Sequence, residues 1–430
     1  MTPVIMDCTE LLRNPIRTGI QRVVRELIRH WPADGPPLHV ARFQPGRPAR
    51  LCPVPASVID LLTDRDPQAL SLSSEQLAAL IDHRQGLSEG VALPEKSIIF
   101  VPELFYDDQR SVFYQGLAKS GHKDLAILCF DFLPFLAPNL FSLKTAAHLM
   151  HYIMAVRSFT HVAHISADTR HDFETRIMRG SAPAGGIVLP LGADGIGVER
   201  QSWRADRRGF LVVGSIDGRK NQRLITEAFT TLRSRGHEID LTIIGRAFEN
   251  QDLAWLREAE RVPGFRWIPN AADSTIAEAY RQVRATIYVS GAEGYGLPPV
   301  ESLSVGVPVI APAAMPSLKG LPPLGQIRID PVGVDTIAEA MLEIMKPGVA
   351  ERLWTEAARL QLANWRDFGQ AAAAWLGERC QPRAAGPKRG RYGSRLSAIR
   401  RSDARGPFRP PGAPRDRSSS GPASDPSPAR

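Results

Sequence analysis

Cysteine and aromatic residues are scarce in this chain, and long apolar runs are absent. The 430 residues include four cysteines, which lie far apart and form no Cys-x-x-Cys pair: Cys8, Cys52, Cys129 and Cys380. This pattern argues against a disulfide framework and predicts reduced, structural thiols in a cytoplasm. The first residues hold no basic run followed by an apolar core, so we expect no secretory signal. The most apolar stretch, LAILCFDFLPFLAPNLF, contains Asp131 and two prolines, so we expect no membrane-spanning helix.

A net positive charge is also absent from most of the chain, although the total is +8. Residues 383–430 hold 12 Lys and Arg against 3 Asp, whereas the rest of the chain sums to −1. This tail is rich in Pro, Gly, Ser and Arg, so we expect it to be disordered. It is either an extension without a role, which we favour slightly, or an electrostatic anchor to anionic lipids. Nucleic-acid binding through the tail is not expected.

What the chain does contain is an alternation of short apolar segments with helical patterns. An apolar content of 43% and a length of 430 residues predict a soluble protein of two domains. Near-continuous apolar runs indicate parallel strands covered on both faces. We predict strands at PVIMDC, LHVARF, SIIFVPE, DLAILCFD, HVAHIS and IVLPLG, and after a linker near 195–208 at FLVVGS, IDLTIIG, FRWIPN, ATIYVS and VPVIA. The expected fold is α/β, with two doubly wound domains facing a central cleft where ligands bind.

Helices are predicted between these strands. In GIQRVVRELIRHW the apolar residues share one face, with Arg22, Arg25, Glu26 and Arg29 opposite. Further helices are expected over 143–157, 169–179, 221–235 and 274–283, and from about Pro298. Residues 46–95 give no regular pattern.

The segment FLVVGSIDGRKNQRLITEAF places small residues and two cations just after a buried strand. Gly214 and Ser215 let the backbone approach a ligand, and Arg219 and Lys220 lie where the loop enters a helix. A diphosphate would meet both cations and the positive end of that helix. Taken alone, a surface turn with two solvated cations is the more frequent explanation of such a motif.

The segment ATIYVSGAEGYGLPPVES is more specific. Its glycines allow several backbone N–H groups to point at a ligand, and Pro298 or Pro299 suits the first turn of a helix. Glu301 is expected within that first turn, where a carboxylate can accept hydrogen bonds from vicinal hydroxyls. Glu293 could accept hydroxyls of a different ring. The alternative for Glu301 is simple charge compensation at the helix N-terminus. The alternative for Glu293 is a solvated position in a loop.

Two glutamates separated by seven residues, followed by Gly-Val-Pro-Val-Ile-Ala, resemble the retaining glycosyltransferases of family 4, also called group 1. GSIDGRKNQRLITEAF, HISADTRHDFE and RTGIQRVVREL resemble further segments of this family, the last one of a subgroup that builds bacterial polysaccharides, often with mannose-type donors. The resemblance covers roughly residues 1–380. It implies the GT-B fold, which is two Rossmann-like domains.

The resemblance also implies domain limits. The acceptor-side domain would span 1–197 and the nucleotide-sugar-binding domain 206–362. A C-terminal helix over 363–382 would pack back on the first domain, and the tail follows over 383–430.

The resemblance further implies roles for single residues. Arg219 and Lys220 would grip the donor diphosphate, Glu301 the ribose and Glu293 the donor sugar. Asp131 matches the aspartate of a family His-Asp pair, but Phe130 stands at the histidine position. The implied catalytic residues are Glu293, Arg219, Lys220 and Asp131. The implied donor-binding residues are Gly19, Gly214, Ser215, Arg219, Lys220, Gly294, Tyr295, Gly296, Leu297 and Glu301.

These groups fit a transferase that needs no metal and no cofactor, because two fixed cations stabilise a departing diphosphate. The expected partners are a nucleotide sugar donor and a glycan or lipid-linked acceptor. The enzyme would be cytoplasmic, with peripheral contact to the inner face of the membrane. A nucleotide-sugar epimerase on the same fold, or a non-catalytic binding protein with a degenerate site, stay open as alternatives.

Three other signals are set aside. The triplet Asp64-Arg65-Asp66 reads as a metal-binding Asp-x-Asp, but it stands in an irregular segment and is best explained by chance. The pairs His148/His151 and His161/His164 lack further acidic or cysteine partners, so packing or surface roles are expected. The run FLPFLAPNLF is either core or a membrane-touching or acceptor-side patch.

Overall fold

The computed structural model describes residues 1–14, 19–64, 93–183, 186–247 and 252–379, with a few single positions between 75 and 83. Residues Met1–Gln381 form one compact unit. The predicted disordered tail, Cys380 and most of the Asp64-Arg65-Asp66 triplet lie outside the described residues.

The first half of the unit is built on a seven-stranded sheet with the order β3-β2-β1-β4-β5-β6-β7. All of its neighbours pair in parallel except β2 and β3. Every residue of β1, β4 and β5 is buried, so both faces of these strands are covered. The strands are β1 Val4–Asp7, β2 Leu38–Gln44, β3 Arg50–Pro53, β4 Ile98–Val101, β5 Leu125–Cys129, β6 His161–His164 and β7 Ile187–Val188.

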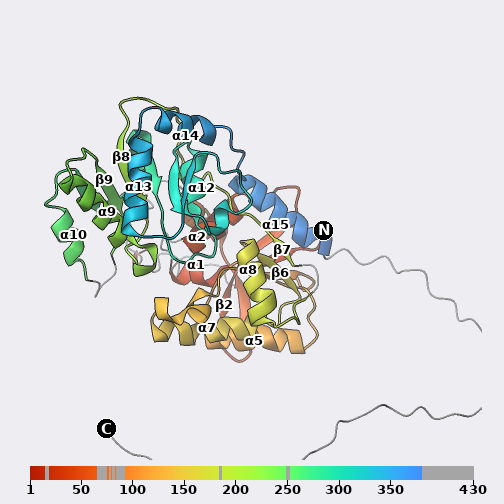
Figure 1. Ribbon diagram of the computed structural model, residues 1–430. Helices are drawn as coiled ribbons and strands as arrows, with labels where there is room; N and C mark the ends of the chain where they lie inside the picture. The colour runs from red at the N-terminus through yellow and green to blue at the C-terminus, as the bar shows by residue number, and fades with distance from the viewer. Residues whose placement is uncertain are drawn as a thin grey trace, which may run out of the picture. The chain divides into compact units, whose positions relative to one another are not determined.

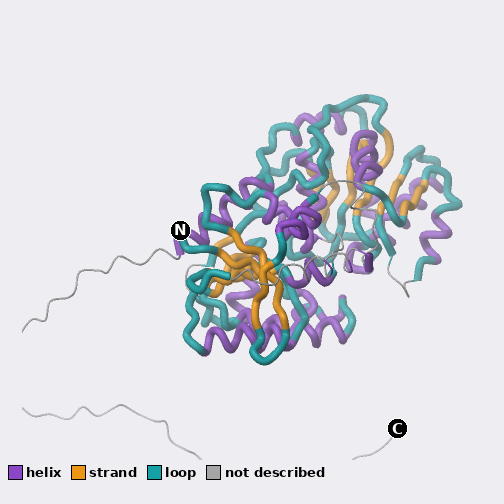
Figure 2. The backbone as a smooth tube through the Cα atoms, turned by 180° about the vertical axis from the view of Figure 1, so that it is seen from behind, coloured by secondary structure: helices purple, strands orange, loops and turns teal. Residues whose placement is uncertain are grey.

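The second half is built on a six-stranded, wholly parallel sheet with the order β10-β9-β8-β11-β12-β13. Figure 2 shows the strands as two separate groups, each flanked by helices. The strands are β8 Arg208–Val213, β9 Leu241–Ile244, β10 Phe265–Ile268, β11 Val283–Ile287, β12 Val309–Pro312 and β13 Gln326–Ile329.

Helices connect the parallel strands, as such sheets require (Figure 1). In the first half they are α1 Thr9–Arg13, α2 Gly19–Arg29, α3 Ala56–Thr63, α5 Asp108–Lys119, α6 Leu133–Leu136, η1 Pro138–Leu140, α7 Leu143–Val156, α8 Ala167–Asp172 and η2 Phe173–Ile177. In the second half they are η3 Gly218–Lys220, α9 Gln222–Ser234, α10 Ala254–Ala259, α11 Asp273–Gln282, α12 Leu297–Ser304, η4 Pro316–Leu318, α13 Val334–Met345, α14 Val349–Ala357 and α15 Trp365–Arg379. No helix of the described residues is both long and apolar enough to cross a membrane.

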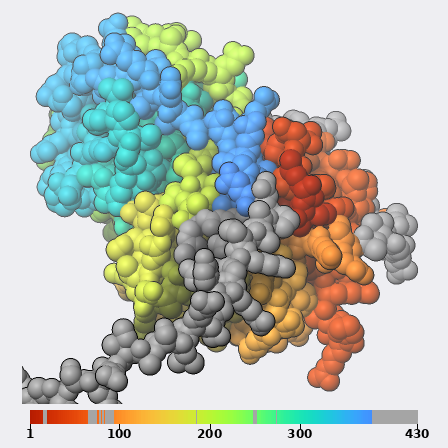
Figure 3. Space-filling model, turned by 90° about the vertical axis from the view of Figure 1, so that its right-hand side faces the viewer, coloured from red at the N-terminus to blue at the C-terminus, as the bar shows by residue number. Residues whose placement is uncertain are grey.

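The last helix, α15, joins the core of the first half. Trp365, Phe368 and Trp375 are buried in the same hydrophobic cluster as β1, β4 and β5, and the Trp375 ring lies 6.1 Å from the ring of Phe100. Helix α15 packs against α2, and Figure 3 shows the blue C-terminal segment beside the red N-terminal one. The first half therefore consists of two separate stretches of chain.

The predicted α/β fold with two parallel sheets is confirmed, and each predicted strand has a counterpart. Some predicted strands extend too far. Strand β7 ends at Val188, and β11 ends at Ile287, so its apolar continuation, Tyr288 and Val289, is already loop. The elements α1, β3, α3, α5, α6, β13, α13 and α14 were missed. Helix α5 has weak amphipathicity in its sequence, DQRSVFYQGLAK, because its buried side includes Arg110 and Ser111.

The predicted polar face of α2 needs one correction. Glu26 was placed opposite the apolar face, but it is only 6% exposed. Its carboxylate pairs with Arg29 and lies 3.4 Å from Nε2 of His30. A charge can be buried when a partner one helical turn away accompanies it, and a sequence pattern of apolar and polar residues does not reveal this.

Candidate functional site

The predicted site residues gather at the carboxyl ends of β8 and β11, which are neighbours in the second sheet. Here the strand order changes direction, since β9 and β10 follow β8 on one side while β11, β12 and β13 lie on the other. Ligands of open parallel sheets bind at this kind of switch point. Two loops meet there, residues 214–221 after β8 and residues 288–296 after β11.

The loop after β8 requires glycine at its first position. Gly214 has a φ of +145°, and a Cβ atom there would lie 2.9 Å from Nζ of Lys220. The Lys220 ammonium donates a 3.2 Å hydrogen bond to Oγ of Ser215. Burial lowers the pKa of Lys220, while the Glu293 carboxylate acts in the opposite direction. The structure therefore holds a half-buried cation against the small residues that the sequence singled out.

Arg219 joins the two loops. Its Nη1 donates a 3.0 Å hydrogen bond to the carbonyl of Ala292 and lies 3.7 Å from Oε2 of Glu293, and its Nη2 donates to Asp217 at 3.3 Å. The guanidinium carbon lies 5.3 Å from the centre of the Phe141 ring, which comes from the first half. The buried Nε has no hydrogen-bond partner among the described residues.

Glu293 is held from two sides. Its Oε1 accepts a 2.7 Å hydrogen bond from the Tyr288 hydroxyl, and its Oε2 faces Arg219. Tyr288 is 6% exposed, and burial together with the Glu293 charge raises its pKa well above the usual range. The hydroxyl therefore keeps its proton and acts as the donor. The carboxylate of Glu293 is fixed in place before any ligand binds.

Asp131 approaches the same loop from the end of β5. A Cβ atom on Gly294 would lie 2.7 Å from Oδ2 of Asp131, so only glycine fits there. Burial raises the pKa of Asp131, and the nearby Glu293 charge adds to that shift. Phe130 is 3% exposed and belongs to the core of the first half. The predicted histidine position is thus filled by a packing residue.

The remaining loop residues shape the backbone. Gly296 has a φ of +89°, and a Cβ atom there would lie 2.5 Å from Sδ of Met315. The Tyr295 hydroxyl donates to the carbonyl of Leu191 at 3.3 Å, and the ring packs between two hydrophobic clusters. A Cβ atom on Gly19 would lie 3.8 Å from Cδ1 of Leu297, which brings the start of α2 to this loop. Tyr295 was predicted as a donor-binding residue, and its hydrogen bond to Leu191 was not predicted.

Glu301 differs from expectation in two respects. Helix α12 begins at Leu297, so Glu301 lies one turn further along, and its first turn contains no acidic residue. The carboxylate is 5% exposed and its Oε1 pairs with Nη1 of Arg22 from α2. The sequence could not reveal this pair, because 279 positions separate the two residues.

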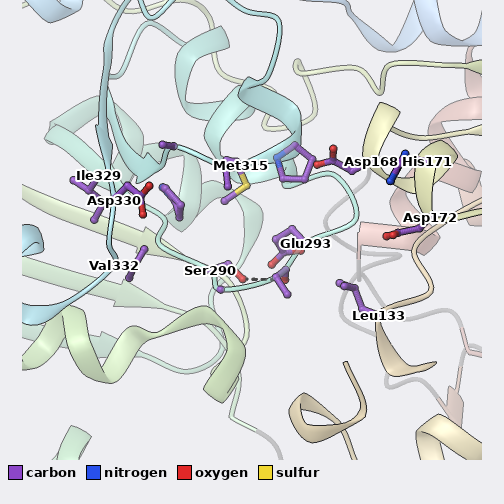
Figure 4. A pocket seen from close by; sticks show the side chains of 16 residues that line it. Leu133, Asp168, His171, Asp172, Ser290, Glu293, Met315, Ile329, Asp330 and Val332 are labelled. Atoms are coloured by element: carbon purple, nitrogen blue, oxygen red, sulfur yellow. Dashed lines mark hydrogen bonds between the residues drawn. The ribbon is translucent and has the colours of Figure 1, made fainter. Parts of the chain in front are cut away.

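A pocket of about 420 Å³ opens beside Glu293 (Figure 4). One wall comes from α8, with Asp168, His171 and Asp172, and the other from the loops after β11, β12 and β13. Its lining combines the carboxylates with apolar groups such as Met315. Of the predicted site residues, Glu293 lines this pocket, whereas Arg219 and Lys220 do not. Carboxylates over an apolar floor suit the hydroxyls and carbon skeleton of a sugar better than an anion.

Sequence reasoning missed four contributors to the site. Tyr288 was read as part of a strand, and Phe141 as part of an apolar run. Asn221 has a left-handed φ of 55°, and its Nδ2 donates to the carbonyl of Val289 at 2.9 Å. Ser166 donates a 2.6 Å hydrogen bond to the carbonyl of Gly294. Only Asn221, a residue type that favours this conformation directly before a helix, carried a signal that could have been used.

The histidine pairs behave as predicted. His164 is 1% exposed, its ring lies 5.1 Å from that of Phe173, and burial lowers its pKa to about 4. His148 is exposed on α7. In the described part of the chain no three His, Cys, Asp or Glu side chains are grouped so that they could hold a metal ion. Whether the protein needs a metal stays a prediction.

Sequence comparison gives one family and several relatives. Residues 198–361 match the family described as Glycosyl transferases group 1. The serotype-specific mannosyltransferase WbdA of Escherichia coli is 32% identical over 105 residues, which are 24% of this chain and 13% of that protein. The O-antigen chain mannosyltransferase B of Escherichia coli is 27% identical over 173 residues, which are 39% of this chain and 44% of that protein. The chain thus covers less than half the length of these curated relatives.

Solved structures resemble nearly the whole described chain. The Anabaena protein Alr3699/HepE in complex with UDP and glucose has a TM-score of 0.58 at 15% identity, over 88% of this chain and 100% of that chain. The lipopolysaccharide glycosyltransferase WaaG has a TM-score of 0.56 at 14% identity, over 87% of this chain and 99% of that chain. At such identities the likeness concerns the fold, and it confirms the GT-B architecture with two Rossmann-like domains.

Proposed function

We propose that this chain, whose residues 198–361 match the family of group 1 glycosyltransferases, is itself a glycosyltransferase of that group. It transfers a hexose, of the mannose type, from a nucleotide-diphosphate sugar to a growing bacterial surface glycan or lipid-linked acceptor. The observation that carries this proposal is the position of Arg219, which faces Glu293 at 3.7 Å and whose Nε has no hydrogen-bond partner among the described residues. A site for a departing diphosphate and a site for a sugar hydroxyl thus lie side by side.

The chemistry follows from these groups. Cleavage of the bond between sugar and diphosphate leaves negative charge on the phosphate oxygens. Arg219 and Lys220, held by their own loop, stabilise that charge without moving. Because these cations are already fixed in the protein, the reaction needs no metal ion. Glu293 binds a hydroxyl of the donor hexose and orients the ring, with the hexose in the pocket between α8 and the loop after β11.

The transfer proceeds with retention of configuration at the anomeric carbon. The acceptor hydroxyl attacks from the face that the diphosphate leaves, and its proton passes to a phosphate oxygen. Glu293 is not a nucleophile in this proposal. Its two carboxylate oxygens are already engaged by Tyr288 and Arg219.

The ribose is assigned to Glu301, as the motif implies. In the structure this carboxylate is buried against Arg22. Ribose binding therefore requires that Arg22 give up or share Oε1 of Glu301. This exchange is a specific consequence of the proposal.

The mannose assignment is supported by the two Escherichia coli relatives, which are named as mannosyltransferases. The lipid-linked acceptor places the reaction at the cytoplasmic face of the membrane. Of the two alternatives, an epimerase would alter the sugar without an acceptor and is less consistent with these relatives. The other alternative, a binding protein with a degenerate site, is favoured only by Phe130. This buried residue stands where the family has a histidine, so the donor site lacks that imidazole.

A donor panel tests the proposal. The purified protein is mixed with single UDP-, GDP- and ADP-sugars, and thermal stabilisation and slow release of the nucleoside diphosphate are measured. We expect nucleotides of one base to stabilise the protein. Among the sugars carried by that nucleotide, we expect one hexose donor to be cleaved with release of the nucleoside diphosphate. Absence of binding to every nucleotide sugar and nucleoside diphosphate would refute the transferase. Conversion of the sugar while it stays attached to the nucleotide would establish an epimerase instead.

Three alanine variants then test the roles. Lys220→Ala and Glu301→Ala should weaken nucleoside diphosphate binding, whereas Glu293→Ala should reduce turnover more than it reduces this affinity. Arg223→Ala is the matched control, because Arg223 is an exposed cation on α9 that pairs with Glu227. Equal loss of affinity in all three variants would contradict the assigned roles.

A further inference from the structure

Helix α7 is apolar on two opposite sides. Its buried side consists of Leu149, Tyr152, Ile153, Ala155 and Val156. The other side should be polar in a surface helix, yet Leu143 is 84%, Met150 40% and Met154 48% exposed. At 100° per residue, Leu143, Ala147, Met150 and Met154 fall within about 60° of arc.

The apolar surface continues into the turns before the helix. Phe135 of α6 is 41% exposed and Leu140 of η1 is 40% exposed, and α6 packs on α7. We call Phe135, Leu140, Leu143, Ala147, Met150 and Met154 the α7 face. Helix α5, beside α7 at the lower edge of Figure 1, adds the exposed Val112. Every exposed large hydrophobic side chain of the described residues belongs to the first half, between Met1 and Met154. An isolated exposed apolar residue needs no explanation, but a contiguous set on one element does.

Charge around this face is positive. Helix α7 has no Asp or Glu; Lys144 is exposed on it, and the exposed Arg157 follows its last residue. The neighbouring α5 has one exposed carboxylate, Asp108, in its first turn. An exposed apolar stripe bordered by cations is the composition of helices that lie in the surface of an anionic bilayer.

The α7 face is also close to the candidate site. Phe141 lies between Leu140 and the cap of α7, and its ring contacts the Arg219 guanidinium at 5.3 Å. An acceptor held by its lipid in the bilayer under α7 would therefore reach the loops after β8 and β11 without leaving the membrane surface.

We propose that the α7 face is a membrane-docking surface that inserts into the headgroup region of an anionic bilayer. A bilayer needs apolar side chains and adjacent cations but no matching shape. A protein partner would need a complementary surface, and the α7 face is one convex helix with the turns before it. The proposal goes beyond the transfer reaction and identifies a surface other than the basic tail. It stands or falls independently of donor binding.

The test is co-sedimentation of the full-length protein with vesicles of phosphatidylethanolamine and phosphatidylglycerol, and with vesicles of phosphatidylcholine alone. We expect binding to the anionic vesicles and weaker binding to the neutral ones. The variant Leu143→Glu/Met150→Glu/Met154→Glu should lose at least about tenfold in binding, because three side chains can no longer insert. Its fold is checked by thermal stabilisation with the nucleoside diphosphate that the wild type binds, or by circular dichroism if none binds.

The control variant adds the same three charges elsewhere, at exposed positions of the second half and α15: Thr355→Glu/Gln361→Glu/Gln370→Glu. This protein should bind anionic vesicles within about twofold of the wild type, since distant surface charges are screened. Equal loss in both variants would reduce the effect to net charge and overturn the proposal. Unchanged binding of the α7 variant would assign the contact to the basic tail. A change in oligomeric state alone would make the α7 face an interface between copies. Unchanged binding and a change in oligomeric state alone would each overturn the proposal as well.

Discussion

Tyr288 donates a 2.7 Å hydrogen bond to Oε1 of Glu293, and the two residues are only five positions apart. Both residues belong to the loop after β11. The Tyr288 hydroxyl holds one oxygen of the carboxylate, and Arg219 faces the other. A carboxylate that is positioned before the substrate arrives loses little free energy in ordering when it binds.

Removal of this hydroxyl should lower turnover. We expect Tyr288→Phe to reduce kcat by about tenfold or more, because a hydrogen bond to a charged group contributes roughly 1.5–3 kcal/mol. Affinity for the nucleoside diphosphate should change by less than about twofold. Steady-state kinetics and calorimetric titration measure the two quantities. Tyr295→Phe is the comparison, since that hydroxyl binds a backbone carbonyl. It should lower stability and reduce kcat less than Tyr288→Phe does. A kcat loss as large in Tyr295→Phe would mean that the loop is simply sensitive to any deletion.

Arg219 should not tolerate lysine. Its guanidinium serves the Ala292 carbonyl, Asp217 and the Phe141 ring at once, and an ammonium group cannot reproduce that geometry. We expect Arg219→Lys to lower kcat/KM by about a hundredfold. The same exchange at the exposed Arg223 should cost less than about twofold. Kinetics with the donor identified in the panel decides this, and near-normal activity of Arg219→Lys would remove the residue from the diphosphate site.

Gly296 is expected to be irreplaceable in the loop. Gly296→Ala should destabilise the protein by about 2–4 kcal/mol. The positive φ of Gly296 opposes any side chain, and the new Cβ atom would lie 2.5 Å from Sδ of Met315. Gly218→Ala provides the contrast, since no atom lies within 4 Å of a Cβ atom placed there. Denaturant unfolding measures both variants. Similar midpoints for the two would contradict the strain assigned to Gly296.

Glu103 should make the first half less stable as pH rises. Its carboxylate accepts from the N–H groups of Glu10 and Leu11 and from Arg110, and burial, opposed by the Arg110 charge, raises its pKa to about 7. The folded state therefore binds this proton more tightly than the unfolded state, whose carboxyl titrates near 4.5. The stabilisation is complete below pH 4.5 and is lost as pH rises to about 7, by at most about 3 kcal/mol.

His164 opposes this trend. Burial lowers its pKa to about 4, so its stabilisation is complete above pH 6.5 and is lost as pH falls through that value toward 4. The two effects largely cancel in the wild type between pH 4.5 and 6.5. The variant His164→Leu should uncover the fall of stability with pH that Glu103 causes. Unfolding free energies at pH 5 and pH 7 measure it, and a rise of stability with pH in His164→Leu would contradict the Glu103 assignment.

The sequence predicted the sheets because buried parallel strands leave continuous apolar runs, and FLVVGS or DLAILCFD need no tertiary information. It failed where a buried position is polar. Arg110 is fully buried against Asp7 and Glu103, so the helix that contains it, α5, carries no apolar periodicity. The short β3 lies antiparallel at the sheet edge and gave no signal either.

For the candidate site, too, the sequence predicted some features and missed others. Gly214, Arg219, Lys220 and Glu293 follow strand ends directly, and their proximity follows from the topology of a parallel sheet. The partners of these residues come from distant parts of the chain. Arg22 for Glu301, Phe141 for Arg219 and Ser166 for Gly294 are contacts between the two halves, and no local pattern encodes them.

The return of α15 to the first core has a practical consequence for recombining such proteins. The backbone N–H of Trp365 donates a 2.8 Å hydrogen bond to Oδ1 of Asp194, and Phe368 and Trp375 fill space beside β1 and β4. A chimera made with one junction near residue 197 would carry a foreign α15 against a native sheet. An exchange of donor specificity between relatives therefore needs two junctions, one on each side of 198–361, so that the segment is replaced as an insert.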